Sequence, residues 1–174
     1  MKNTTLCYIE HKGKVLMLFR NKKKKDANEG KWIGIGGKFK ENESPEECML
    51  REVYEETGIE LKKWKYRAVI TFASDRWEGE YMHLFTATSD TDEVCTCNEG
   101  TLKWIDKEDI LSLNMWDGDR VFLELLDKGE DFFSLKLIYE GDKLIKAIKD
   151  GQTNESGRRR GIAKQTVQRY GNER

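Results

Sequence analysis

Residues 37–59 read GKFKENESPEECMLREVYEETGI and carry the start, body and end signals of one helix. Ser44 and Glu47 form the S-x-x-E pattern of a capping box, and Pro45, the only proline in the chain, suits the first helical position. Gly58 is typical of the residue that ends a helix. The sequence therefore predicts one well-capped helix between these signals.

The side chains of this helix are expected to divide into an apolar face and an acidic face. The predicted buried stripe consists of Met49, Leu50, Val53, Tyr54 and Thr57, and the opposite side of Arg51, Glu52, Glu55 and Glu56. The three glutamates stand at i, i+3 and i+4, where mutual repulsion destabilises a helix unless a cation intervenes. Oxygen-only ligands suit Mg²⁺ or Mn²⁺. The alternative interpretation is a solvated acidic surface without a ligand.

Three glycines, Gly34, Gly36 and Gly37, precede the helix. They would let the backbone approach a bulky anionic ligand closely. A bulge or a tight turn explains the same glycines equally well.

Strands and shorter helices are predicted on both sides of this segment. We expect strands at residues 3–9, 14–20, 32–35, 64–74, 80–88, 102–105, 132–139 and 143–148, with a turn at Lys12 and Gly13, a brief helix that Asp106 caps, and a second main helix at 119–127. This mixed order predicts an α/β fold in which a mixed sheet lies between helices.

The chain length of 174 residues predicts one domain, residues 1–150, followed by a tail, residues 151–174. The tail has six basic residues against two acidic ones and little apolar periodicity, so we expect it to be mobile or weakly helical. Its arginine cluster at 158–160 lacks interleaved aromatic residues, which makes a nucleic acid the less favoured partner.

The composition also argues against a membrane protein and a secreted protein. The longest apolar run, residues 15–19, is five residues long, whereas a membrane span needs about 20 and a signal-peptide core about 7 to 15. The four cysteines show no C-x-x-C spacing, so reduced thiols are expected. Cys95 and Cys97 would share one face of a strand, but a zinc site needs two such pairs or nearby histidines. We expect a cytoplasmic monomer with no membrane partner.

The helix and the glycines together match one continuous pattern, G-x5-E-x7-R-E-U-x-E-E-x-G-U, in which U is aliphatic. The matching residues are Gly37, Glu43, Arg51, Glu52, Val53, Glu55, Glu56, Gly58 and Ile59. In this pattern the sequence resembles the Nudix hydrolase family. The resemblance implies an α/β/α sandwich that hydrolyses a diphosphate linkage in a nucleotide with the help of a divalent metal ion, Mg²⁺ or Mn²⁺.

The resemblance also implies roles for individual residues. Glu52, Glu55, Glu56 and the carbonyl of Gly36 would be metal ligands, one of the glutamates also holding the attacking water. Arg51 would orient the carboxylates by charge-assisted hydrogen bonds, and Glu43 would be a supporting contact.

Outside this pattern the chain resembles the MutT-type oxidised purine nucleoside triphosphatases, in particular their animal-type branch. The shared features are Lys23, the Gly-Lys-Trp sequence at 30–32, Glu99, and Met-Trp-Asp-Gly-Asp at 115–119. The resemblance implies that Glu99 is a further metal or catalytic residue and that the expected substrate contacts are Thr5, Lys23, Gly36, Gly37, Lys38, Phe72, Trp116, Asp117 and Asp119. The implied function is sanitation of the nucleotide pool by release of a monophosphate and pyrophosphate, in the manner of an 8-oxo-dGTP diphosphatase.

Alternatives remain for the base contacts and for the substrate. Trp116 is equally well explained as a core aromatic, and Asp117 or Asp119 as a helix cap. The chain departs from the animal-type pattern at Ile33, where an amide is usual, and at Gly118, which separates the two aspartates. The alternative functions are hydrolysis of another nucleotide or of RNA 5′ ends, and non-catalytic binding of a nucleotide or RNA.

Overall fold

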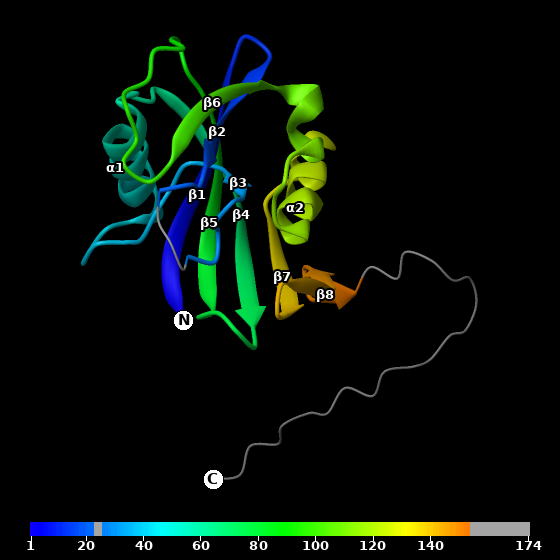
Figure 1. Cartoon of the computed structure of the whole chain (residues 1–174). Helices are drawn as coiled ribbons and strands as arrows, with labels where there is room; N and C mark the ends of the chain where they lie inside the picture. Colours follow the sequence, from blue (N-terminus) through cyan, green and yellow to red (C-terminus); the bar gives the residue numbers. More distant parts are fainter. Residues whose placement is uncertain (23–25, 154–174) are drawn as a thin grey trace, which may run out of the picture.

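The computed structural model describes residues 1–22 and 26–153, which form a sheet between two helical layers (Figure 1). Helix α1 (Pro45–Thr57) lies on one side of the sheet, and the 3-10 helix η1 (Lys107–Ser112) and helix α2 (Asp117–Asp127) lie on the other. This arrangement confirms the predicted α/β/α sandwich. Within the described residues, no helix has both the length and the apolar content that a bilayer crossing demands.

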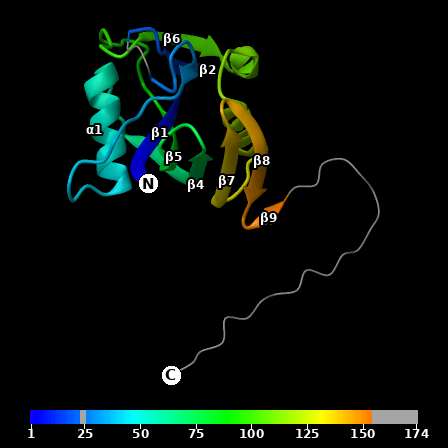
Figure 2. The same cartoon turned by 60° about the horizontal axis from the view of Figure 1, so that its bottom comes forward.

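The described residues contain nine strands in one mixed sheet, seen edge-on in part in Figure 2. The strands are β1 (Lys2–His11), β2 (Lys14–Phe19), β3 (Trp32–Ile33), β4 (Lys63–Ser74), β5 (Glu80–Thr88), β6 (Thr101–Asp106), β7 (Phe133–Glu140), β8 (Lys143–Lys149) and β9 (Gln152–Thr153). Their order is β3-β2-β1-β5-β4-β7-β8-β9, and β6 pairs with β2. The pairs β1–β5 and β4–β7 are parallel, and the other pairs are antiparallel.

The first hairpin forms where the sequence predicts it. Strands β1 and β2 pair antiparallel, with His11 opposite Lys14. The turn residues Lys12 and Gly13 have φ values of 45° and 77°, a left-handed conformation that glycine adopts without steric cost.

Residues 34–38, the glycine segment, run beside the part of β1 that does not pair with β2. The amide of Thr5 donates to the Gly37 carbonyl at 2.9 Å, and Ile35 and Cys7 exchange backbone hydrogen bonds. A Cβ atom on Gly36 would lie 2.0 Å from the Thr5 carbonyl oxygen. Close strand pairing therefore requires glycine at this position, whatever else binds there.

Each face of the sheet has its own hydrophobic core. The core on the α2 side includes Phe122, Ile70 and Leu135. The core on the α1 side includes Met49, Val53 and Phe85. Two independent layers of packing therefore hold α1 and α2 at fixed positions on the sheet.

The predicted faces of α1 are wrong at two residues. Tyr54 is 56% exposed, and Glu56 is 7% exposed. Glu56 follows Met49 and Val53 at i+7 and i+3, so the helical repeat places it on the side that faces the sheet. The sequence interpretation assigned Glu56 to the outer face because of its charge.

Three smaller expectations are also corrected. Residues 91–97 form no strand, so Cys95 and Cys97 do not share a strand face; Cys95 is exposed and Cys97 is buried. Asp106 precedes η1 but makes no side-chain capping hydrogen bond. Residues 152–153 pair with β8 as β9, so the sheet extends beyond residue 150. The rest of the predicted tail, residues 154–174, lies outside the described residues.

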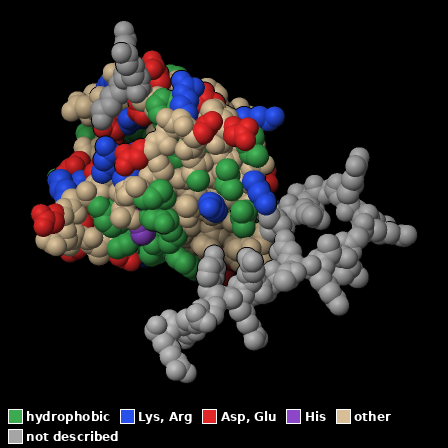
Figure 3. Space-filling view, turned by 90° about the horizontal axis from the view of Figure 1, so that it is seen from below, with side chains coloured by type: hydrophobic (Ala, Val, Ile, Leu, Met, Phe, Trp, Pro, Cys, Tyr) green, Lys and Arg blue, Asp and Glu red, His purple; other side chains and the backbone are tan. Residues whose placement is uncertain are grey.

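An aromatic cluster surrounds His83 on β5. The rings of Phe39 and Tyr66 lie 5.0 and 5.8 Å from the His83 ring, and Phe132 packs edge-on against Tyr66. Figure 3 shows hydrophobic side chains gathered around a histidine on the surface seen from below. His83 therefore has the packed role that is usual for a histidine outside a metal site.

The capping box at the start of α1 provides a test of the local fold. The Ser44 hydroxyl accepts a hydrogen bond from the Glu47 amide at 3.2 Å, and the Glu47 carboxylate accepts one from the Ser44 amide at 2.8 Å. We expect Ser44→Ala to lower the free energy of unfolding by about 1 kcal/mol, measured by urea denaturation. Ser134→Ala, at an exposed serine of β7, is the control. Equal stability of the two variants would contradict the capping role.

Candidate active site

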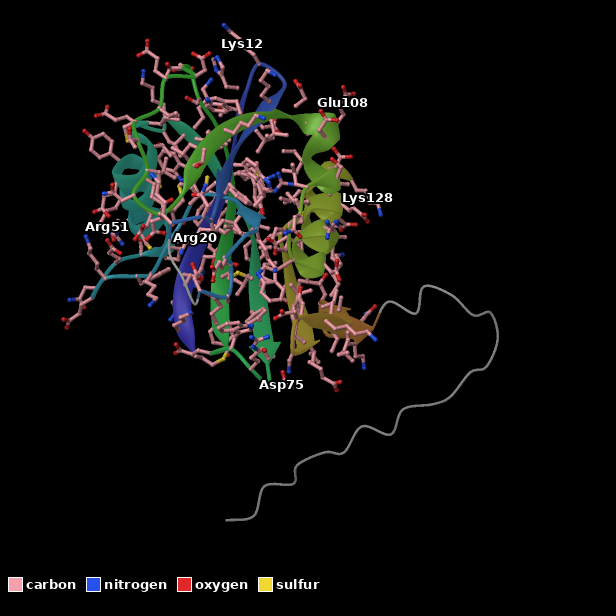
Figure 4. All side chains as sticks on the ribbon, in the orientation of Figure 1. Lys12, Arg20, Arg51, Asp75, Glu108 and Lys128 are labelled. Atoms are coloured by element: carbon pink, nitrogen blue, oxygen red, sulfur yellow. The ribbon has the colours of Figure 1, made fainter. Side chains whose placement is uncertain are left out.

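Arg51 lies at the centre of the acidic face of α1 (labelled in Figure 4). Its Nη1 donates to Glu52 Oε1 at 2.6 Å and to Glu55 Oε2 at 3.2 Å, and its Nη2 donates to Glu43 Oε2 at 2.8 Å. One guanidinium thus contacts three carboxylates and offsets the repulsion among them.

Glu43 connects the loop before α1 to this arginine. A second hydrogen bond from Arg51 Nε reaches Glu43 Oε1, so the pair is bidentate. The hydrogen bonds from Arg51 lower the pKa of Glu43 to about 2, and the same contact raises the pKa of Arg51. Arg51 Nη2 also donates to the Lys38 carbonyl at 3.0 Å, which fixes the loop against the helix.

The Glu52 carboxylate lies against Gly37. A Cβ atom at Gly37 would be 2.5 Å from the carboxyl carbon of Glu52. The absence of a side chain at Gly37 therefore makes the space that Glu52 occupies. Glu55 lies further out, half-exposed, and also pairs with Lys40 at 3.3 Å.

Glu56 is a buried carboxyl group in an acidic environment. Its Oε2 is buried and has no hydrogen-bond partner among the described residues. Burial raises the pKa of Glu56 to about 8, with further contributions from the charges of Glu99 and Glu52, while a backbone hydrogen bond from Gly36 lowers it. Glu56 thus contacts the backbone amide of Gly36, whereas the metal contact expected of Gly36 is its carbonyl.

Glu99 joins this group from a distant part of the chain. It lies just before β6 and forms an ion pair with Arg20, which directly follows β2 and is 8% exposed. Arg20 also pairs with Asp26. The sequence interpretation missed Arg20 and chose Lys23, which lies outside the described residues. An arginine at the end of a buried strand was the signal that could have identified it.

The donor chemistry of this group fits a hard divalent cation. The side chains of the group offer only oxygen donors, and the buried Glu56 Oε2 has no partner within the described part of the chain. Among the residues that the structure describes, no three His, Cys, Asp or Glu side chains already stand close enough to hold one ion. The contacts of Arg51 with Glu52 and Glu55 explain this, because they turn both carboxylates toward the guanidinium. Rotation of these side chains would therefore have to precede metal binding.

Trp116 lies on the other side of the sheet, at the start of α2. Its side chain is buried, and its Nε1 donates to Asn28 Oδ1 at 2.8 Å. Phe72 and Tyr139 both pack edge-on against it, with ring centroids 6.0 and 5.1 Å from the indole. Lys31 Nζ lies 4.7 Å from the centre of the indole ring. In this arrangement Trp116 is packed as a core aromatic residue.

The two aspartates after Trp116 have different surroundings. Asp117 is exposed and pairs with Arg120 at 3.1 Å. Asp119 is buried, and burial raises its pKa to about 7. Neither side chain caps α2, whose N-cap residue is Trp116. The structure therefore groups Asp119 with the aromatic residues and leaves Asp117 at the surface.

Gly118 separates the two aspartates for a steric reason. Its amide donates to the Tyr139 hydroxyl at 2.7 Å. A Cβ atom at this position would lie 2.5 Å from a Leu137 methyl group and 2.6 Å from that hydroxyl. Close packing of α2 on β7 therefore excludes a second acidic side chain here.

The remaining predicted contact residues, Thr5 and Lys38, lie next to the backbone that leads into α1. Thr5 is buried, and its hydroxyl is 3.6 Å from Cys48 Sγ, so it supports the glycine segment from within the protein. The Lys38 side chain is exposed beside the acidic face.

A chain of polar contacts connects the acidic group to Trp116. Arg20 contacts both Glu99 and Asp26. The Asp26 carboxylate accepts a hydrogen bond from the Asn28 amide at 3.1 Å, and the Asn28 side chain accepts the one from Trp116. The sequence analysis did not identify Asp26 or Asn28.

Comparison with known proteins gives consistent matches over this part of the chain. Residues 2–126 match the family model described as the NUDIX domain. The chain is 32% identical over 136 residues to the uncharacterized Nudix hydrolase YvcI of Bacillus subtilis (strain 168), a match that covers 75% of this chain and 82% of that protein. It is 31% identical over 127 residues to the oxidized purine nucleoside triphosphate hydrolase of Danio rerio, covering 72% and 79%. The crystal structure of a MutT protein from Bacillus halodurans superimposes with a TM-score of 0.76 and 25% identity, covering 87% of this chain and 99% of that one.

The buried Glu56 predicts how stability depends on pH in the metal-free protein. The pKa of Glu56 is about 8 in the folded state, above the ordinary 4.5. Between these values the folded protein holds a proton that the unfolded chain has released, so stability falls as the pH rises. Glu56→Gln has no proton to lose, and we expect its Tm to exceed that of the wild type at pH 8 and to approach it near pH 4.5.

Differential scanning calorimetry in the presence of EDTA measures this difference. Glu60→Gln, at an exposed glutamate just beyond the helix, is the matched control and should follow the wild type at every pH. A Tm difference for Glu56→Gln that did not change with pH would show that the carboxyl group is not the cause.

Proposed function

The chain belongs to the Nudix hydrolase family, and from this premise we propose that it hydrolyses oxidised purine nucleoside triphosphates to a monophosphate and pyrophosphate in a Mg²⁺-dependent reaction. The observation that carries the proposal is the buried carboxyl group of Glu56 beside Glu52 and Glu99, whose Oε2 has no hydrogen-bond partner among the described residues. A binding module without catalysis has no use for such a costly group.

The acidic group would hold the divalent metal that Nudix hydrolases generally use. Glu52, Glu55, Glu56 and Glu99 are the residues proposed to bind it. When bound, such an ion neutralises phosphate charge and supplies a reactive water-derived nucleophile near neutral pH. The protein's own part is to place the carboxylates and compensate their charge.

Arg51 and Arg20 provide that compensation. Arg51 holds Glu52 and Glu55 on one side of the group, and Arg20 holds Glu99 on the other. Both arginines keep their charge at every physiological pH, so this compensation is present at any pH at which the enzyme works. Among the described residues neither arginine forms an ion pair with Glu56, which is left as the carboxyl group whose protonation changes near neutral pH.

The base would bind at the aromatic group of Trp116 and Phe72. An indole gives stacking on a base worth about 1 to 3 kcal/mol. Lys31 covers one face of Trp116, so stacking on that face requires displacement of the ammonium group. Asp119, with a pKa of about 7, can donate a hydrogen bond to a purine acceptor when it is protonated.

The comparisons support the choice of substrate class. The Danio rerio relative is named as a hydrolase of oxidized purine nucleoside triphosphates, and the match to it covers 72% of this chain. The MutT protein of Bacillus halodurans shares the fold over most of this chain.

Nucleotide hydrolysis tests the proposal directly. The panel is 8-oxo-dGTP, 2-hydroxy-dATP, unmodified dNTPs, ADP-ribose and dinucleoside polyphosphates with Mg²⁺, and ion exchange separates the products. We expect preference for an oxidised purine triphosphate with monophosphate and pyrophosphate as products, and a decrease of kcat by about a hundredfold or more in Glu56→Gln. Glu60→Gln should retain the wild-type rate. No turnover of any compound, or preference for ADP-ribose, would refute the proposed substrate.

The raised pKa of Asp119 predicts a pH-dependent preference for purines. Its protonated fraction falls as the pH rises through about 7, so the hydrogen-bond donor is lost. We expect the ratio of kcat/KM for 8-oxo-dGTP to that for dTTP to decrease between pH 6 and pH 8. A titration that changes kcat/KM by the same factor for both substrates, such as that of Glu56, cancels in this ratio.

Asp119→Asn should abolish this pH dependence, because an amide keeps one donor at every pH. Asp109→Asn, at an exposed residue of η1, should leave the dependence as it is in the wild type. A pH-dependent ratio that persisted in Asp119→Asn would assign the effect to another group.

A further inference from the structure

A second concave site lies between the sheet and the helices η1 and α2. It is a cleft of about 960 Å³, and its apolar wall consists of Val15, Ile110, Leu111, Leu123 and Leu126. None of its lining residues belongs to the acidic group or to the aromatic group of Trp116. Figure 4 marks Glu108, which lines the cleft, on the η1 side of the molecule, and Arg51 on the α1 side. The volume is in the range of pockets that hold small molecules.

A β-bulge directs Arg67 into this cleft. Tyr66 pairs with Phe85 and Ala68 with Leu84, so Arg67 is an extra residue in β4. Its Nη1 donates to the Thr86 hydroxyl at 3.3 Å, which shows that the guanidinium lies on the α2 side of the sheet. Bulges of this kind change the direction of a side chain and are frequent beside functional sites.

The Arg67 guanidinium has only neutral partners among the described residues. Besides Thr86, it donates to the Glu130 carbonyl at 3.2 Å. Its Nε is buried and has no acceptor. The nearby carboxylate of Glu130 is held by Lys149 at 3.0 Å instead. A partly buried guanidinium without a carboxylate is an unusual arrangement, because it leaves a charge and a donor unsatisfied.

The other charges of the cleft make its β4 side positive. Lys63 and Lys65 stand on the same strand as Arg67. Two of the acidic lining residues are already paired: Glu10 with Lys107 at 3.0 Å and Asp106 with Lys14 at 2.9 Å. Positive charge on β4 thus faces, across the cleft, a wall of apolar side chains that also carries the carboxylates of Glu108 and Asp127.

We propose that this cleft binds a small organic anion whose apolar body packs on Leu111, Leu123 and Leu126 and whose anionic group pairs with the Arg67 guanidinium. An anion with two or more acceptor oxygens, such as a carboxylate or a sulfonate, supplies the negative partner that this guanidinium lacks among the described residues. The site is separate from the one proposed for hydrolysis, so it is a second ligand site in this chain.

Paired fluorescent probes test the proposal. The anionic probe is 8-anilinonaphthalene-1-sulfonate, and N-phenyl-1-naphthylamine has the same aromatic body without the sulfonate. We expect the sulfonate to bind at one site and to shift the amide NMR resonances of residues 65–67, 86–88 and 107–111. Arg67→Gln should weaken the sulfonate by about tenfold and leave the neutral probe unchanged. Arg67→Lys should restore part of the loss.

A second pair of variants covers the case in which Arg67→Gln does not fold. Leu111 is 42% exposed and lies on the cleft wall, and Ile145 is 46% exposed on β8 outside the cleft. Leu111→Ala should weaken both probes, whereas Ile145→Ala should weaken neither. NMR shifts confined to the aromatic cluster around His83 or to α1, or equal affinity of Leu111→Ala and the wild type, would overturn the proposal.

Discussion

The carboxylates of Glu52, Glu55, Glu56 and Glu99 repel one another, and the arrangement of the candidate site follows from how the protein offsets this repulsion. Glu52, Glu55 and Glu56 fall within little more than one turn of α1, and Glu99 approaches them from the strand side. Left alone, such a group would destabilise the helix and resist burial. Arg51 and Arg20 compensate three of the four charges by ion pairs, and Glu56 instead has a raised pKa. Glu56 is thus the one carboxyl group of the four that no ion pair among the described residues neutralises.

The glycines before α1 follow from the same constraint. Gly36 allows the backbone to pair tightly with β1, and Gly37 leaves room for the Glu52 carboxylate. A side chain at either position would force the segment away from the strand or the carboxylate away from the segment. The glycine segment is therefore shaped by contacts within the protein, and these same contacts bring the Gly36 amide to Glu56.

The sequence predicts those parts of the fold and of the candidate site that depend on neighbouring residues alone. The capping box and the hairpin turn are local patterns, and each lies where it was expected. The burial of Glu56 was missed because polarity indicated the outer face, whereas the helical repeat places the residue against the sheet. Arg20 was missed because its partner Glu99 is far away along the chain, and Asp26 was missed because it is connected to Glu99 only through Arg20. No local pattern reports such a contact. The exposure of Asp117 depends likewise on where α2 begins relative to β7.

The polar contacts between Glu99 and Trp116 give the two halves of the proposed site a common support. Arg20 and Asp26 are both largely buried, and each contacts a neighbour on either side. In a low-dielectric environment the loss of one member leaves its neighbours unsatisfied, so such a network acts as a unit. The loop that carries Asn28 is also tied to the start of α2, because Asn114 donates to the Gly30 carbonyl and accepts from the Trp32 amide. A shift of Glu99 would therefore loosen its contact with Arg20 and change the support of Trp116. The residues proposed to hold the metal and those proposed to hold the base thus depend on one polar network.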